Sequence, residues 1–304
     1  MYTKDDFIEI LRRSVLDDLF KDFRERRRWA RQLLEPLAWS PAGHFAHLAA
    51  AFDHDVAQLG FRAAIQRVLP NFVSAVDVQG SAGIPEEGPL LVVSNHPGTC
   101  DSLAIAAALP RDDLQIVAFG FPLLRQLPAA RQHLIFASHD ISERMAVVRA
   151  GIRHLRQGGA LLIFPRGRVE PDPAVAPGAP ESVQAWSPSL EILTRQAPDA
   201  RVLVTIVSDV LRPGFIRNPL NWMWRGQRDP LVVAETLQTA IQMLFPRRVQ
   251  VRPRIYFDLP STVDELRQRM RVEAVRDAIV LRAQQLLAQR PELPQVEAQA
   301  PRHV

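Results

Sequence analysis

Hydrophobic and polar positions follow two different periods along this 304-residue chain. In residues 5–35 the apolar side chains recur at the spacing of an amphipathic helix, with arginine and aspartate between them. Pro36 and Pro41 interrupt this pattern, and a further helix is expected over residues 53–69. The pattern therefore predicts an N-terminal helical domain over residues 1–71.

Beyond this domain the pattern changes to short apolar runs. Runs rich in Val, Ile and Leu that end at polar or turn-forming residues are typical of strands, and they occupy residues 72–80, 90–94, 114–119, 133–138, 160–164, 201–207 and 251–259. Helices are expected over 101–108, 141–156, 187–197, 231–245 and 262–289. The alternation predicts an α/β fold with a mixed, largely parallel sheet flanked by helices. We expect this domain to span residues 72–290, followed by a disordered tail over 291–304.

Composition indicates the cellular compartment of the protein and the charge of its binding partner. The single cysteine, Cys100, cannot form an intramolecular disulfide, which fits a reducing, cytoplasmic compartment. The N-terminus lacks the apolar core of a secretory signal, and no apolar stretch is long enough to predict a membrane span. The formal charge of +4 favours an anionic partner.

The stretch LLVVSNHPGTCDS, residues 90–102, ends an expected buried strand in a turn with candidate chemistry. His96 can accept and return a proton near neutral pH. Asp101 lies at the start of an expected helix and can face back toward His96, where a carboxylate would fix the tautomer of the imidazole. The same residues also fit a plain turn in which Asp101 is a helix N-cap.

A second polar loop follows a later expected strand. Arg166 and Arg168 flank Gly167, so that two guanidinium forks surround a residue that lets the backbone approach an anion closely. Phosphate is the natural ligand of such a loop. In the alternative, the arginines pair with Glu170 and Asp172 and only order the loop.

At these residues the sequence resembles the glycerophospholipid acyltransferases, such as the glycerol-3-phosphate and lysophosphatidate acyltransferases. NHPGTCD resembles their first block, Asn-His followed by four residues and Asp, and FPRG resembles their third, usually Phe-Pro-Glu-Gly-Thr-Arg. The resemblance covers roughly residues 72–259. Arg166 stands where the family usually has Glu, and the Asp-Arg pair of the second block is replaced by a segment over 138–140 with Arg144 shortly after it.

The resemblance implies a reaction as well as a fold similar to that of glycerol-3-phosphate acyltransferase. A fatty acyl group would move from acyl-ACP or acyl-CoA to a hydroxyl of a glycerol phosphate or lysophospholipid, with His96 as general base and Asp101 as its orienting residue. Arg166, Gly167, Arg168 and Arg144 are the candidate substrate-binding residues, and neither a metal nor an organic cofactor is expected. Two alternatives remain: a non-catalytic lipid-binding relative, and a His-dependent thioesterase or lipid hydrolase.

Two weaker candidates involve other ligating or nucleophilic side chains. Cys100 beside Asp101 could act as a nucleophile, although a small buried thiol is the commoner case. His44, His47 and His54 could suggest a metal site, but their spacing matches no known ligand pattern.

Residues 211–230 concentrate Trp222, Met223 and Trp224 among arginines. Aromatic rings with cations suit a membrane interface, and they equally suit packing against the N-terminal helices. No recognition motif accompanies the positive charge, so nucleic acid is not the expected partner. We expect a cytoplasmic enzyme that associates peripherally with the inner face of the membrane.

Overall fold

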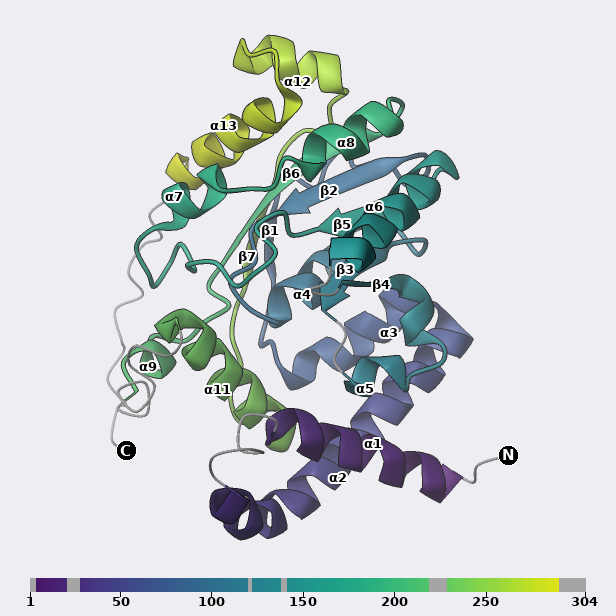
Figure 1. Cartoon of the computed structure of the whole chain (residues 1–304), viewed down its shortest axis with the longest axis vertical. Coiled ribbons are helices and arrows are strands. Elements are labelled where there is room, and N and C mark those ends of the chain that lie inside the picture. Colours follow the sequence, from purple (N-terminus) through teal and green to yellow (C-terminus); the bar gives the residue numbers. More distant parts are fainter. Residues whose placement is uncertain (1–3, 21–27, 120–121, 138–140, 219–228, 290–304) are drawn as a thin grey trace, which may run out of the picture.

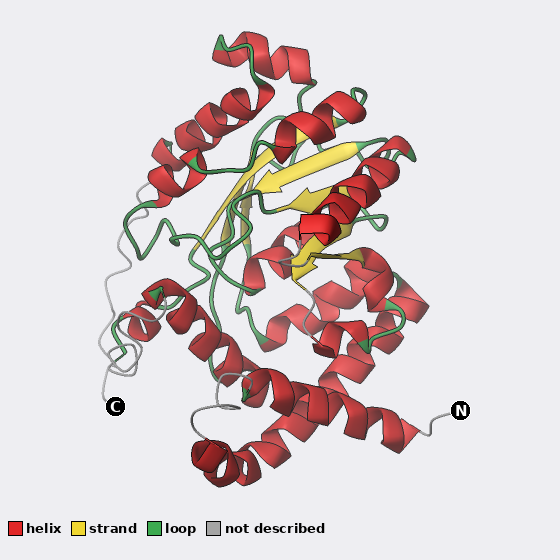
Figure 2. Cartoon of the chain, viewed as in Figure 1, coloured by secondary structure: helices red, strands yellow, loops and turns green. Residues whose placement is uncertain are grey.

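The chain forms a layered α/β structure in which helices cover both faces of one sheet (Figures 1 and 2). The computed structural model describes the chain except for residues 1–3, 21–27, 120–121, 138–140, 219–228 and 290–304. The sheet has seven strands in the order β1-β7-β6-β2-β5-β3-β4. The predicted fold class is therefore confirmed.

Each strand forms within one of the apolar runs. The strands are β1 (Asp77–Gln79), β2 (Leu90–Ser94), β3 (Gln115–Phe119), β4 (Leu134–Ala137), β5 (Ala160–Ile163), β6 (Arg201–Ser208) and β7 (Arg254–Phe257). Strands β6, β2, β5, β3 and β4 are mutually parallel, whereas β7 is antiparallel to β6 and carries β1 parallel to itself. The carboxyl ends of five strands therefore lie at one edge of the sheet.

The helices divide between the two faces. One face is covered by α1 (Lys4–Leu19), α2 (Arg28–Leu59), α3 (Phe61–Val68), α4 (Cys100–Ala108), α5 (Pro122–Arg125) and α11 (Pro230–Leu244). The other is covered by α6 (Ile141–Arg156), α7 (Ala179–Gln184), α8 (Ser189–Gln196), α12 (Val263–Met270) and α13 (Val275–Ala288). A short helix, α9 (Pro213–Ile216), precedes α11, and the 3₁₀ helices cover Leu69–Asn71 and Ala130–His133.

Two hydrophobic clusters explain why a central strand such as β2 is apolar nearly without a break. Leu90 and Val92 of β2 face the cluster that includes the N-terminal helices, while Leu91 and Val93 face the cluster under α8 and α13. Successive side chains of a strand point to opposite faces, so a strand covered on both sides needs apolar residues at every position. The N-terminal helices thus share a core with the sheet, and the expected boundary at residue 71 falls in the 3₁₀ turn before β1.

The expected helix interruption at Pro36 and Pro41 is wrong, because α2 continues through both prolines. Each proline removes a helical hydrogen bond, at a typical cost of about 3 kcal/mol. The small side chains of Ala38, Ala42 and Ala46 are buried on the same helix, and α2 packs along α1 and α3. This burial offsets the local cost, so tertiary packing overrides propensity here.

Two helices predicted as continuous are each divided in two. The helix expected over 53–69 breaks at Gly60, whose φ of 87° belongs to the left-handed region. The helix expected over 262–289 breaks after Met270, where Arg271 takes a φ of 57°. In both cases the residue that changes conformation lets the second helix turn back onto the core.

None of the helices within the described residues is long and apolar enough to cross a membrane. The expected tail over 291–304 lies outside the described residues.

Candidate active site

The candidate site lies at the carboxyl edge of the parallel strands, where loops after neighbouring strands meet. Strands β2 and β5 pair in parallel, with Val93 opposite Ile163. His96 comes three residues after Val93, and Arg166 comes three residues after Ile163. The two residues therefore follow their strands at the same level of the sheet. Open α/β sheets bind ligands at this edge.

His96 and Asp101 meet directly. Nδ1 of His96 lies 2.9 Å from Oδ2 of Asp101, and the backbone N–H of Gly98 donates to the same oxygen over 3.1 Å. Asp101 is fully buried in the first turn of α4, whereas 27% of the His96 side chain is exposed. The carboxylate thus holds one ring nitrogen, and Nε2 is left to exchange a proton with a molecule at the surface.

The surroundings set the proton affinity of this pair. Burial alone would lower the pKa of His96, but the charge and hydrogen bond of Asp101, and then the charges of Glu235 and Glu170, raise it above its usual value. Burial raises the pKa of Asp101, against the opposing effects of His96 and of the Gly98 N–H. The imidazole is therefore a stronger base than a free histidine.

Asn95 anchors the turn that carries His96 to the sheet. Its side-chain amide donates to the carbonyl of Val207 over 2.9 Å and accepts from the N–H of Val207 over 2.7 Å. This reciprocal pair continues the pairing of β2 with β6 by one residue beyond the end of β2, so the residue before His96 is fixed in position.

Glu170 holds the backbone of His96 from the neighbouring loop. Its N–H donates to the His96 carbonyl over 2.7 Å, and its Oε1 accepts from the His96 N–H over 3.2 Å. The carboxylate also accepts from Ser182 Oγ over 2.8 Å and from Trp186 Nε1 over 3.2–3.3 Å. Glu170 is 2% exposed, and burial raises its pKa above the usual value.

Asp172 orders the next part of the same loop. Its carboxylate accepts four backbone N–H groups, from Ala174, Asp209, Val210 and Leu211. Within the described residues, no ion pair joins Glu170 or Asp172 to Arg166 or Arg168. The alternative in which these carboxylates pair with the arginines is therefore wrong, because both are occupied by backbone and side-chain donors.

Glu235 of α11 holds the other side of the turn that carries His96. Its Oε1 accepts from the Thr99 N–H over 3.1 Å, from the Thr99 hydroxyl, and from Thr239 Oγ1 over 2.9 Å. Its Cγ lies 3.4 Å from where a Cβ would stand on Gly98. The turn between His96 and Asp101 is thus enclosed by carboxylates from two other segments.

The sequence analysis missed Glu170 and Glu235 as site residues. Glu170 carried a usable signal, because a carboxylate soon after a strand end lies at the functional edge of an α/β sheet. For Glu235 the signal was the spacing of polar residues in an apolar helix: Glu235, Gln238 and Gln242 follow at intervals of three and four. Gln238 and Gln242 are both buried, so this polar stripe faces the interior.

The loop over residues 166–168, which we call the arginine loop, is held by fewer hydrogen bonds. Arg166 Nε is buried with no hydrogen-bond partner among the described residues, and Arg168 is exposed. Gly167 takes a φ of 65°, its N–H donates to the Phe164 carbonyl over 3.0 Å, and an added Cβ would meet open space. The Phe164 ring stacks at a tilt on His96, with centroids 4.5 Å apart, so the two loops are in contact.

Arg144 does not lie with His96, Asp101 and Arg166 in the structure. Arg144 is exposed in the first turn of α6, after β4. Strand β4 lies three positions from β2 in the sheet, a separation of about 14 Å at the usual strand spacing.

The weaker candidates do not form sites. Burial raises the pKa of the Cys100 thiol to about 12, so it stays protonated at neutral pH and is a poor nucleophile. No group of three potential metal ligands occurs within the described part of the chain. Trp222, Met223 and Trp224 lie outside the described residues.

Comparisons with known proteins address the family. Residues 75–197 match the family model described as Acyltransferase. No curated protein matches the chain. Among solved structures, the 1-acyl-sn-glycerophosphate (LPA) acyltransferase PlsC from Thermotoga maritima is similar over 94% of this chain and 95% of its own, with 16% sequence identity and a TM-score of 0.43. The segment matched by the family model contains both NHPGTCD and FPRG.

Proposed function

We propose that this chain transfers a fatty acyl group from a thioester to a hydroxyl of a phosphorylated glycerol or lysophospholipid. One observation carries the proposal: a partly exposed imidazole held by a buried carboxylate, inside a segment that matches the acyltransferase family model. The pair supplies a general base with a fixed tautomer, which is what deprotonation of a hydroxyl requires.

The reaction follows from this arrangement. His96 Nε2 takes the proton of the acceptor hydroxyl while its oxygen attacks the thioester carbonyl. Asp101 stabilises the imidazolium that forms. The carbon–sulfur bond then breaks, the imidazolium returns the proton to the departing thiolate, and the products are an ester and a free thiol.

The acceptor's phosphate is assigned to the arginine loop. Arg166 follows β5 at the same level at which His96 follows β2, and Arg168 comes two residues later. Arg166 also has a buried donor that makes no hydrogen bond to the described residues. Two forked cations beside the base would bind a phosphate and direct a neighbouring hydroxyl to His96. Gly167 leaves open space above the loop for this ligand.

The test is a transfer assay with purified protein. Radiolabelled palmitoyl-CoA and palmitoyl-acyl carrier protein are each offered glycerol-3-phosphate or a panel of lysophospholipids, with His96→Ala as the negative control and Cys100→Ser as the neighbouring control. We expect labelled ester that depends on the acceptor. Free fatty acid released at the same rate without acceptor would indicate a hydrolase instead, and no turnover of any thioester would indicate a non-catalytic relative.

We also propose that the enzyme acts in the cytoplasm at the membrane surface, because an acylated glycerolipid partitions into a bilayer and the chain is basic. Sedimentation with phosphatidylglycerol vesicles tests this association. We expect binding that salt reverses, and weaker binding after Trp222→Ser with Trp224→Ser. Binding that is absent at low salt would contradict the proposal.

A further inference from the structure

The surface between α6 and α8, on the outer side of the domain, is hollowed by a groove of about 500 Å³. Its apolar lining includes Met145, Ile152 and Ile192, and its basic lining consists of Arg149, Arg153 and Arg156. We call this surface the α6–α8 groove. It shares no residue with the site around His96.

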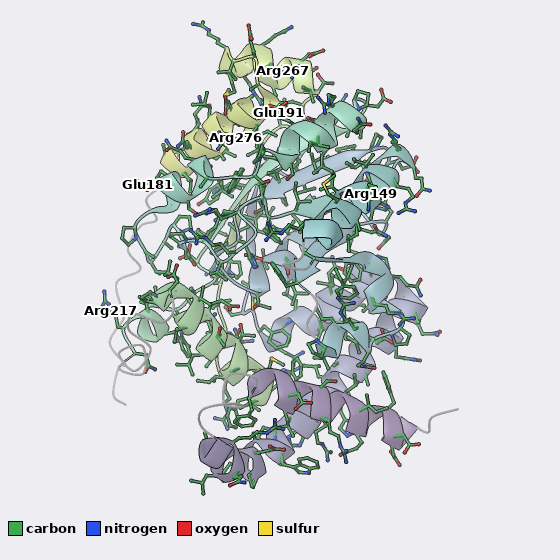
Figure 3. The ribbon with its side chains drawn as sticks, in the orientation of Figure 1. Arg149, Glu181, Glu191, Arg217, Arg267 and Arg276 are labelled. Atoms are coloured by element: carbon green, nitrogen blue, oxygen red, sulfur yellow. The ribbon has the colours of Figure 1, made fainter. Side chains whose placement is uncertain are left out.

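No described carboxylate forms an ion pair with the arginines of the α6–α8 groove. Arg149 and Arg153 are exposed and form no ion pair with the described residues. Glu191 of α8 is engaged elsewhere, because its Oε1 accepts the backbone N–H of Arg276 on α13 over 2.9 Å; Figure 3 labels Arg149, Glu191 and Arg276. Of the apolar lining, Met145 is exposed, and Ile152 and Ile192 are half-buried. A surface with unpaired arginines beside accessible apolar side chains is typical of an interaction site.

The groove has a closed end and an end near the catalytic edge. Arg156 closes one end by donating to the carbonyl and side-chain oxygens of Gln196, over 2.7 and 2.8 Å. At the other end, Met145 is 46% exposed and lies four residues from the start of α6, a rise of about 6 Å. Helix α6 starts after β4 at the edge where the parallel strands end (Figure 1). The lining residues of α6 run from Met145 to Arg156, so the groove follows this helix away from that edge.

We infer that the α6–α8 groove binds an acidic amphipathic helix of an acyl carrier protein that delivers the acyl donor. Apolar side chains between two helices, flanked by arginines, fit a helix with apolar anchors and carboxylates beside them. A flat bilayer would instead contact apolar side chains that protrude, whereas these line a hollow. The inference rests on the proposed acyl transfer and names its donor as a protein-bound thioester.

The experiment compares two donors in one variant. In Arg149→Glu with Arg153→Glu, we measure KM for palmitoyl-acyl carrier protein and for palmitoyl-CoA, and titrate unacylated acyl carrier protein to obtain Kd. The matched control is Arg131→Glu with Arg248→Glu, which makes the same charge change at exposed arginines away from the groove. Melting temperatures check folding. If the variant with two glutamates is unstable, Arg149→Gln with Arg153→Gln replaces it.

We expect the groove variant to raise KM for the carrier-bound donor and Kd for the carrier about tenfold or more, because like charges then face each other across the interface. KM for palmitoyl-CoA should change no more than in the control, and the carrier effect should shrink at 0.5 M salt, where the Debye length falls to roughly 4 Å. Equal effects on both donors, or unchanged carrier binding, would overturn the inference.

Two further outcomes are distinguishable. If no thioester is turned over, the proposed function fails, but the titration of unacylated carrier still decides whether the groove binds it. If the groove variant loses binding to phosphatidylglycerol vesicles while carrier binding is unchanged, the surface is a membrane contact and the inference is wrong.

Discussion

The turn after β2 and the turn after β5 lie side by side at one level of the sheet, yet their side chains are held to different extents. In the His96 turn, the side chains of Asn95, Asp101 and Thr99 each form a hydrogen bond, although Asp101 Oδ1 is buried without one among the described residues, and Glu170 holds the backbone. In the arginine loop, the buried Nε of Arg166 has no hydrogen-bond partner among the described residues. The difference suggests two tasks: the first turn must hold one geometry, while the second keeps hydrogen-bonding capacity for a ligand.

The largest expected effect comes from the base itself. His96→Ala should lower the acyl-transfer rate about 10²–10⁴-fold, because general-base catalysis typically contributes this much. Initial rates at saturating donor and acceptor measure the loss. The control is Cys100→Ser, which changes a buried residue of the same turn and leaves His96 and Asp101 in place. An unchanged rate in His96→Ala would contradict the assigned role.

The support of the first turn is tested by Glu170→Ala. The substitution leaves Trp186 Nε1 and Ser182 Oγ without their acceptor, at a typical cost of about 1–3 kcal/mol for each unsatisfied group. We expect a lower melting temperature and a lower kcat, and Glu170→Gln should recover part of both because its amide oxygen can still accept. A variant as stable and active as the original would show that the Glu170 carboxylate is not needed to hold the His96 backbone.

The second turn is tested by lysine substitutions. Arg166→Lys should raise the acceptor KM about tenfold to hundredfold, because a charge-assisted hydrogen bond is worth about 1.5–3 kcal/mol and lysine lacks the fork. Arg168→Lys should have a smaller effect, since Arg168 is exposed. An effect confined to the donor KM would remove both arginines from the acceptor site.

The smallest effect concerns pH. Only neutral imidazole can take a proton, and the charge of Glu235 raises the pKa of His96, so activity should rise with pH through a value above the usual one for histidine. Glu235→Gln keeps an acceptor for Thr99 but removes the charge, so the acidic limb of the kcat/KM profile should move to lower pH. A limb that stays in place or moves to higher pH would contradict the assigned influence of Glu235.

The sequence predicted much of this fold because the sheet is covered on both faces, which makes central strands such as β2 and β5 apolar nearly without a break. It also identified the turns that carry His96 and Arg166, since both follow such runs. It did not predict the unbroken α2 at Pro36 and Pro41, where burial of alanines outweighs a local penalty. Nor did it predict that Glu235, 139 positions after His96, would reach the His96 turn, because that contact depends on how α11 packs.

The central claim is that His96 and Asp101 act as one unit in acyl transfer. The direct measurement is a double-mutant cycle: transfer rates for His96→Ala, Asp101→Asn and the two changes together. Because Asp101 acts only through the imidazole, the double variant should be no slower than His96→Ala alone. Losses that multiply would show that the two residues contribute independently, and would contradict the account.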